Sequence, residues 1–143
     1  VPWRRAVWPD ESNPNKTPSR EKNYEENLLI FDGKNIITKY ANTITTKQDR
    51  NPNSGVIKFN HPDKRSDYRN LTPRECFLLM GFDEDDFQEL INNNVLVKSN
   101  YSFFTMQKLI KLAGNSIVVD ILESIFIQIN DLNNISLTNY MEE

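Results

Sequence analysis

The sequence predicts an α+β protein in which a small β-rich region is followed by a helical segment. Up to about residue 68, short apolar runs alternate with turn residues; from residue 72 onward, apolar residues recur at helical spacing. The chain has 143 residues, of which 38% are hydrophobic and 26% are charged, with a net charge of −3. This composition is typical of one soluble globular domain and gives no global positive field of the kind that nucleic-acid binders often have.

Counts of individual residue types exclude several kinds of site. A single Cys excludes an internal disulfide framework and a multi-cysteine zinc site, and a single His excludes paired histidine ligands for a metal. No apolar run approaches the ~20 residues that span a bilayer, and the N-terminal residues lack the apolar core of a signal peptide. We therefore expect no membrane association and a reduced cytoplasmic compartment. The first residue is Val rather than Met, which favours a fragment, a processed chain or an engineered one.

The first region, residues 1–26, is predicted to be an extended arm because it is rich in Pro, Asn, Lys and Glu. Two interpretations stay open. The arm is the tail of a neighbouring domain, or it docks on a partner surface through Trp3, Trp8, Arg4 and Arg5, since exposed Trp side chains favour burial.

The β-rich region is predicted to span residues 27–68. Asp32-Gly33 lies between two β-prone runs, which predicts a hairpin over residues 27–40 because a tight primed turn requires positive φ. Strands are also expected at 43–46 and 56–59, followed by a polar turn at 60–68.

The helical region, residues 69–132, begins with a complete start signal. Thr72 is the expected N-cap, Pro73 occupies the first helical position, and Glu75 completes a capping box. Leu71 is placed to pack onto Cys76, and Gly81 is expected to end this helix.

Three further helices are expected. The second covers 83–93 with an acidic first turn, and the third begins at Thr105 and is stopped by Gly114. The last begins at Ile117, capped by Asn115-Ser116, and runs to about Leu132 with apolar residues around nearly its whole circumference. Residues 133–143 are expected to fray as a polar tail.

Few residues point to catalysis. Cys76 lies among Phe, Leu and Met, which favours a small buried side chain over a nucleophile. His61 lies in a polar loop without a partner for base catalysis. The acidic run at 83–86 lacks the spacing of a calcium loop, so a solvated helix start is the better interpretation.

Two segments could bind ligands. Gly114-Asn115-Ser116, at the start of an apolar helix, could hold an anion on free N–H groups, or it could simply separate two helices. The stretch 43–55 combines Thr, Lys, Gln, Arg and Asn with turn residues, which could read base edges and hold phosphates, or could form an ordinary polar loop.

Two longer motifs resemble conserved motifs of the DNA cytosine-5 methyltransferases. Residues 69–82, RNLTPRECFLLMGF, resemble the ninth motif of that family, and residues 112–119, LAGNSIVV, resemble its tenth and last motif. Upstream of both, residues 41–46, ANTITT, are similar to part of the target-recognition region of the bacterial restriction-modification enzymes. The order and separation fit the C-terminal end of the family.

The resemblance implies a part of an enzyme that transfers a methyl group from S-adenosylmethionine to C5 of a cytosine flipped out of double-stranded DNA. The family's cofactor loop and its Pro-Cys nucleophile motif do not occur in this sequence. The chain alone is therefore expected to be inactive. Its apolar last helix, which in the family packs beside a Rossmann-like sheet, is expected to need the catalytic half of the enzyme or to self-associate. The alternative is a non-catalytic DNA-binding or assembly subunit derived from such an enzyme.

The resemblance also implies roles for individual residues. Asn115, Ser116 and Ile117 are implied to lie near S-adenosylmethionine. The residues implied to face DNA are Thr43, Ile44, Thr45, Thr46, Lys47, Gln48, Arg50 and Asn51. Those implied to organise the structure around them are Arg69, Thr72, Arg74, Glu75 and Cys76.

Overall fold

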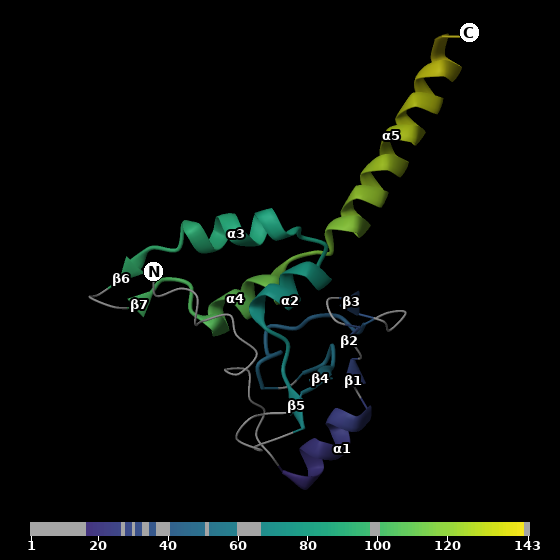
Figure 1. Cartoon of the computed structure of the whole chain (residues 1–143). Helices are drawn as coiled ribbons and strands as arrows, with labels where there is room; N and C mark the ends of the chain where they lie inside the picture. The colour runs from purple at the N-terminus through teal and green to yellow at the C-terminus, as the bar shows by residue number, and fades with distance from the viewer. Residues whose placement is uncertain are drawn as a thin grey trace.

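The computed structural model describes residues 17–26, 28–29, 31–32, 35–36, 41–50, 52–59, 67–97 and 101–141. Helices alternate with small sheets, which confirms the α+β class (Figure 1). The elements in chain order are α1 (Pro18–Glu26), β1 (Leu28–Leu29), β2 (Phe31–Asp32), β3 (Asn35–Ile36), β4 (Val56–Lys58), β5 (Tyr68–Arg69), α2 (Pro73–Leu79), α3 (Glu84–Asn92), β6 (Leu96–Val97), β7 (Tyr101–Ser102), α4 (Met106–Asn115) and α5 (Val119–Met141).

The largest sheet has β4 as its central strand. β4 pairs in parallel with β1, with Leu28 opposite Val56, and antiparallel with β5, with Ile57 opposite Arg69. Both Val56 and Ile57 are buried, so this strand carries the sheet into the core. The expected strand at 56–59 is confirmed.

The expected hairpin is present but uses its turn residues differently. β2 and β3 pair antiparallel with Phe31 opposite Ile36 and Asp32 opposite Asn35. Asp32 is therefore a paired residue of β2 and not part of a turn, whereas the expected turn was Asp32-Gly33; Gly33 lies outside the described residues. β1 lies outside the hairpin, because it pairs with β4 instead.

The extended-arm prediction is wrong for residues 18–26, which form α1; residues 1–16 lie outside the described part of the chain. The Thr17 carbonyl accepts from the N–H groups of Arg20 and Glu21, each at 2.9 Å, and Pro18 occupies the first helical position. A Pro at that position favours a helix start, because its missing N–H has no partner there in any helix. Tyr24 is buried with its ring 6.1 Å from that of Tyr68, which ties α1 to the sheet.

The helical start signals behave as the sequence predicts. Thr72 and Glu75 form the capping box of α2, and Gly81 follows the helix with φ +84°. α3 begins with a second capping box, between Asp83 and Asp86. Both boxes satisfy N–H groups that would otherwise lack a partner at a helix start.

A short hairpin between α3 and α4 was not expected. β6 and β7 pair antiparallel, with Leu96 opposite Ser102. The buried Asn94 side chain closes its base, donating to the Phe104 carbonyl at 2.9 Å and accepting from the Phe104 N–H at 2.8 Å. Thr105 then caps α4, as predicted.

The junction between the last two helices differs from the prediction. Gly114 lies inside α4 rather than after it, and Ser116 ends that helix instead of capping the next. α5 begins at Val119, two residues later than expected, and continues to Met141, so the predicted fraying tail is helical over most of its length.

The core lies where α2 and α4 pack together and against β4. Its buried hydrophobic residues are Ile44, Ile57, Leu71, Cys76, Phe77, Met80, Phe87, Leu109, Ile110 and Ala113. Leu71 and Cys76 belong to the same cluster, as expected for a hydrophobic residue preceding the capped helix start.

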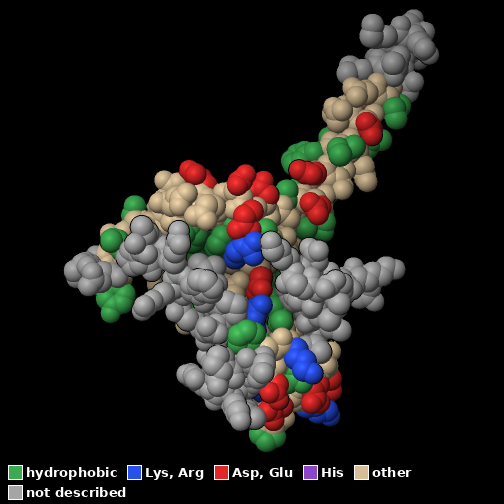
Figure 2. Space-filling view, viewed as in Figure 1, with side chains coloured by type: hydrophobic (Ala, Val, Ile, Leu, Met, Phe, Trp, Pro, Cys, Tyr) green, Lys and Arg blue, Asp and Glu red, His purple; other side chains and the backbone are tan. Residues whose placement is uncertain are grey.

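α5 extends away from this core (Figure 1). Its apolar side chains, among them Ile121, Ile125, Phe126, Ile129 and Leu132, are exposed. Acidic side chains gather over α3 and the base of α5 in the view of Figure 2. By length and composition alone, the helical stretch 106–135 could cross a membrane, although the sequence has no uninterrupted apolar run of that length. One such helix is weak support for a membrane span, because an apolar helix that packs on another protein passes the same test.

Candidate functional site

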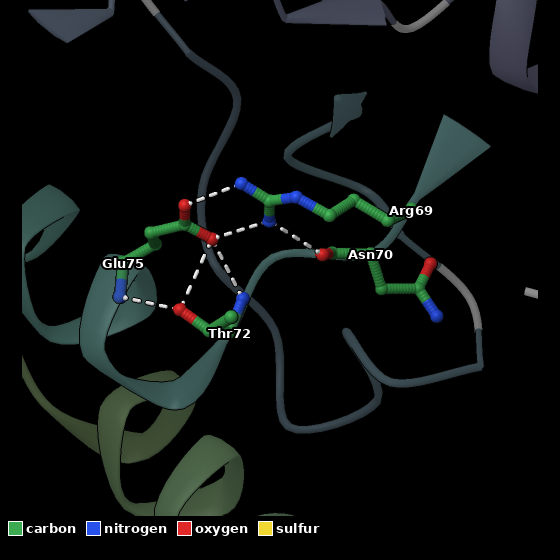
Figure 3. Close-up of polar contacts among 4 residues, drawn as sticks. All are labelled: Arg69, Asn70, Thr72 and Glu75. Carbon is green, nitrogen blue, oxygen red and sulfur yellow. Dashed lines mark hydrogen bonds and ion pairs between the residues drawn. The ribbon is translucent and has the colours of Figure 1, made fainter. Parts of the chain in front are cut away.

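A network of polar side chains joins the end of β5 to the start of α2 (Figure 3). The Arg69 guanidinium faces the Glu75 carboxylate with two parallel hydrogen bonds, Nη1 to Oε2 and Nη2 to Oε1, each at 2.8 Å. Glu75 Oε2 also accepts from the Thr72 N–H at 2.8 Å and from the Thr72 hydroxyl at 3.1 Å. One carboxylate therefore completes the capping box and holds Arg69 at the same time.

Burial makes this pair stronger than a surface ion pair. The Arg69 and Glu75 side chains are 9% and 15% exposed, and a bidentate Arg–carboxylate pair fixes both position and orientation. The Arg69 guanidinium also lies 5.8 Å from the centre of the Phe59 ring. These contacts fix the end of β5 against the start of α2.

Arg74 behaves differently, although it lies next to Glu75. It points outward and pairs with Glu84 of α3, through a 2.8 Å hydrogen bond from Nε and an ion pair through Nη2. The Glu84 hydrogen bond raises the pKa of Arg74. Both partners are largely exposed, so the pair connects α2 and α3 at the surface and lies outside the Arg69 network.

Asn70, the residue after Arg69, reaches the 43–55 loop, which precedes β4. Its buried side-chain amide donates to the Asp49 carbonyl at 3.1 Å. Inside the loop, the fully buried Gln48 donates to the Gly55 carbonyl at 3.1 Å and accepts from the Ser54 N–H at 3.2 Å. Asn53 donates to the Thr43 carbonyl at 3.0 Å. The strand expected at 43–46 is absent, and the Thr43 carbonyl accepts from the Asn53 side chain instead of a neighbouring strand.

This loop geometry separates the residues predicted to face DNA. Thr43, Lys47 and Arg50 are exposed, and Thr45 and Thr46 are partly buried. The prediction is wrong for two side chains, because Ile44 is buried in the core and Gln48 is buried inside the loop with its amide bonded to backbone. Asn51 lies outside the described residues. The exposed positive groups of the loop are Lys47 and Arg50, of which Arg50 pairs with Asp49 at 3.3 Å.

The predicted cofactor residues lie at the junction of α4 and α5. Asn115 is exposed at the last turn of α4, and Ile117 is also exposed. The Ser116 hydroxyl donates to the Ala113 carbonyl at 2.7 Å. The predicted helix N-terminus at Gly114-Asn115-Ser116 is wrong, because these residues end α4; anion binding on free N–H groups therefore has no basis there.

Cys76 is fully buried in α2. Burial, together with the neighbouring Glu75 carboxylate, raises the pKa of the thiol to about 12. The nucleophilic form of a cysteine is its thiolate, so this side chain is unreactive at neutral pH. Among the described residues, no cluster of three His, Cys, Asp or Glu side chains could hold a metal ion; His61 lies outside them.

We expect Cys76→Ala to lower the free energy of unfolding by about 1–2 kcal/mol, because it leaves a small cavity in the core. The wild-type thiol should stay unreactive toward an alkylating reagent from pH 7 to 9 in the folded chain and react once urea unfolds it. The folded state keeps the thiol proton above the ordinary cysteine pKa of 9.0, up to about 12. The contribution of this thiol to stability should therefore fall as pH rises from 9 toward 12. Rapid alkylation of the folded chain at pH 8 would contradict a buried, protonated thiol.

With this geometry in view, comparison with known proteins assigns the class. Residues 4–131 match the family described as C-5 cytosine-specific DNA methylase, and the chain belongs to that family. The orphan methyltransferase M.Rho11sI of Bacillus phage rho11s is 38% identical over 116 residues, which cover 81% of this chain and 19% of that protein. The type II methyltransferase M2.ScrFI of Lactococcus lactis subsp. cremoris is 31% identical over 112 residues, 78% of this chain and 28% of that protein. The chain thus spans only 19% to 28% of the length of these two curated relatives.

Proposed function

We propose that this chain is the target-recognition and closing portion of a bacterial, cytoplasmic DNA cytosine-5 methyltransferase. In this proposal, residues 27–68 form the recognition region and residues 69–132 close the methyltransferase fold. The observation that carries it is the Arg69–Glu75 network, which uses the residues of the ninth-motif resemblance to hold β5, α2 and, through Asn70, the 43–55 loop. Other parts of the enzyme supply the reactive cysteine.

We propose that the chain faces DNA with the outer side of the 43–55 loop. Lys47 and Arg50 present positive charge, and Thr43 presents a hydroxyl, at exposed positions. Such groups contact phosphates and, in the major groove, the acceptor edge of guanine. Gln48 and Asn70 act behind them by holding the loop in shape.

The residues proposed to contact S-adenosylmethionine would form one side of its binding site rather than a complete pocket. The exposed amide of Asn115 can donate and accept hydrogen bonds to polar groups, and the exposed Ile117 side chain offers an apolar contact. S-adenosylmethionine would supply the methyl group. The role of this chain is to hold and orient it from the α4–α5 junction, together with the missing half of the enzyme.

The missing half also explains α5 in this proposal. One face of the helix groups Ile121, Ile125, Ile129 and Leu132, which are all about half exposed or more. Each large apolar side chain buried in a contact contributes about 1.5–3 kcal/mol, so docking this face on the catalytic half is strongly favourable. α5 carries three acidic and no basic residues, so two copies of α5 would repel each other along their polar sides. The charge therefore favours the catalytic half over self-association.

Catalysis in the proposal takes place on that other half. Enzymes that react with a base must first take it out of the stack, and the nucleophile must then reach C6 of the flipped cytosine. Cys76 is buried with a pKa of about 12 and cannot do this. The chain contributes DNA contact, orientation of the cofactor and closure of the fold.

The test of the recognition role is duplex binding by loop variants. We expect Lys47→Ala and Arg50→Ala each to weaken binding about fivefold, and to lower the slope of log affinity against log salt by about one per lost phosphate contact. Lys22→Ala, which removes the same charge from the exposed face of α1, serves as the matched control. Titrations of a labelled duplex at two salt concentrations measure both quantities. Equal effects of all three changes would place DNA recognition elsewhere, and no binding by the wild-type assembly would favour a pure assembly subunit.

A further inference from the structure

Gly114 lies where helix α4 touches the backbone of the 43–55 loop. A Cβ atom at this position would come within 2.4 Å of the Thr45 carbonyl carbon, 2.4 Å of the Thr46 nitrogen and 2.8 Å of the Thr45 oxygen. Side chains essentially never approach backbone atoms so closely. Glycine is therefore required here by close approach, since Gly114 lies inside a regular helix and does not end it.

The loop cannot easily move away from this contact. Ile44, directly before it, is buried in the core, and the Thr45 carbonyl accepts from the Gln48 N–H at 3.2 Å. Gln48 in turn binds Ser54 and Gly55 across the loop. A displacement at Thr45-Thr46 would thus disturb the segment that carries Lys47 and Arg50.

On its other side, Gly114 is continuous with the α4–α5 junction. The Ser116 N–H donates to the carbonyls of Leu112 and Ala113, each at 3.1 Å. At the start of α5, the Val119 N–H donates to the Met80 carbonyl at 2.9 Å. The segment 115–118 is therefore held between a contact with the loop and a contact with the end of α2.

We propose that Gly114 is a positioning residue that couples the 43–55 loop to the α4–α5 junction. The assignment of DNA to the loop and of S-adenosylmethionine to the junction rests on the proposed function. The contact between Gly114 and the loop backbone does not depend on it. Because the loop and the junction meet backbone to backbone, an ordered loop favours one position of Asn115 and Ile117. Binding of either ligand should then strengthen binding of the other by the same factor, since such coupling is reciprocal.

The first experiment tests the contact in the chain alone, by hydrogen exchange of Gly114→Ala. We expect the amides of Gln48, Arg50 and Ser54 to exchange about tenfold faster or more, because the loop is displaced from α4. The Cys76 amide, bonded to the Thr72 carbonyl in the first turn of α2, should keep its wild-type rate and so report an intact fold. Gln107→Ala, at an exposed position of the same helix, controls for helix propensity. Unchanged loop exchange in Gly114→Ala would overturn the proposal.

The second experiment tests the coupling in the enzyme assembled with its catalytic half. We expect cognate duplex to tighten S-adenosylmethionine binding about fivefold or more in the wild type, and to have almost no effect in Gly114→Ala. A ratio of about one in the wild type, or an unchanged ratio in the variant, would overturn the coupling. If Gly114→Ala does not fold, Gln48→Ala serves instead, because it loosens the loop without adding an atom to α4. Gln48→Ala must then lower the ratio of S-adenosylmethionine affinities measured with and without cognate duplex. A wild-type assembly that binds neither ligand contradicts the proposed function, whereas the exchange experiment still decides the role of Gly114.

Discussion

Arg69→Met should destabilise the folded chain by about 3–5 kcal/mol, the range expected when one partner of a buried ion pair is removed. The substitution leaves the Glu75 carboxylate without the two 2.8 Å hydrogen bonds from Arg69, in a place where only 15% of its side chain is exposed. Without Arg69, a charged Glu75 carboxylate would lose most of the hydrogen bonds that offset the free-energy cost of removing it from water. Urea denaturation of the wild type and the variant measures the difference.

Arg74→Met is the matched control, because it removes the same group from an exposed ion pair, the one between Arg74 of α2 and Glu84 of α3. We expect it to cost less than about 1 kcal/mol. Arg69→Met combined with Glu75→Gln should recover part of the loss, since the amide carries no charge and can still accept from Thr72. Equal costs for Arg69→Met and Arg74→Met would show that the buried network does not hold the fold as described.

The second large effect is expected on α5. Ile125→Asp combined with Ile129→Asp should weaken association with the catalytic half at least about 100-fold. A 100-fold change in affinity corresponds to about 2.7 kcal/mol, and burial of two isoleucine side chains contributes more than that. Both residues are exposed in this chain, at 45% and 47%. The unfolding free energy of the chain alone should therefore change little. Analytical ultracentrifugation of the mixture measures the association.

Ser124→Asp is the control for this change, since it adds a negative charge to the polar side of the same helix. Ser124 is exposed, and its hydroxyl donates to the Asp120 carbonyl. We expect it to associate almost as the wild type does. If Ser124→Asp and the isoleucine variant weaken association equally, the apolar face of α5 is not the docking surface.

The parts of the fold that sequence could predict depend on local signals. The capping boxes at Thr72-Glu75 and Asp83-Asp86 involve residues three apart, and Gly81 follows its helix directly. The start of α1 carries a comparable signal, Thr17-Pro18, but the richness of that region in proline argued against any helix. Proline opposes a helix only beyond its first turn.

The features that sequence could not predict depend on contacts between distant residues. Glycine ends helices and also permits close approach, and only the packing of α4 on Thr45-Thr46 assigns Gly114 to the second role. Gln48 was predicted to contact DNA because a polar side chain is usually exposed. Its amide instead hydrogen-bonds the backbone N–H of Ser54 and the carbonyl of Gly55. Residues 43–46 form no strand despite their β-branched side chains; Thr45 and Thr46 lie against Gly114 of α4, and the Thr43 carbonyl accepts from Asn53. The Arg69–Glu75 contact, in contrast, joins residues six apart within one motif, at the end of a strand and the start of the next helix.

The most direct test of the central claim is methyl transfer from labelled S-adenosylmethionine to duplex DNA, measured for this chain alone, for a catalytic portion from a relative such as M.Rho11sI alone, and for the two together. We expect labelled 5-methylcytosine only in the mixture, because the proposed function assigns DNA recognition and the closing helix to this chain and the reactive cysteine to the other portion. Methylation by the 143-residue chain unaided, or a mixture whose components neither associate nor methylate, would contradict it.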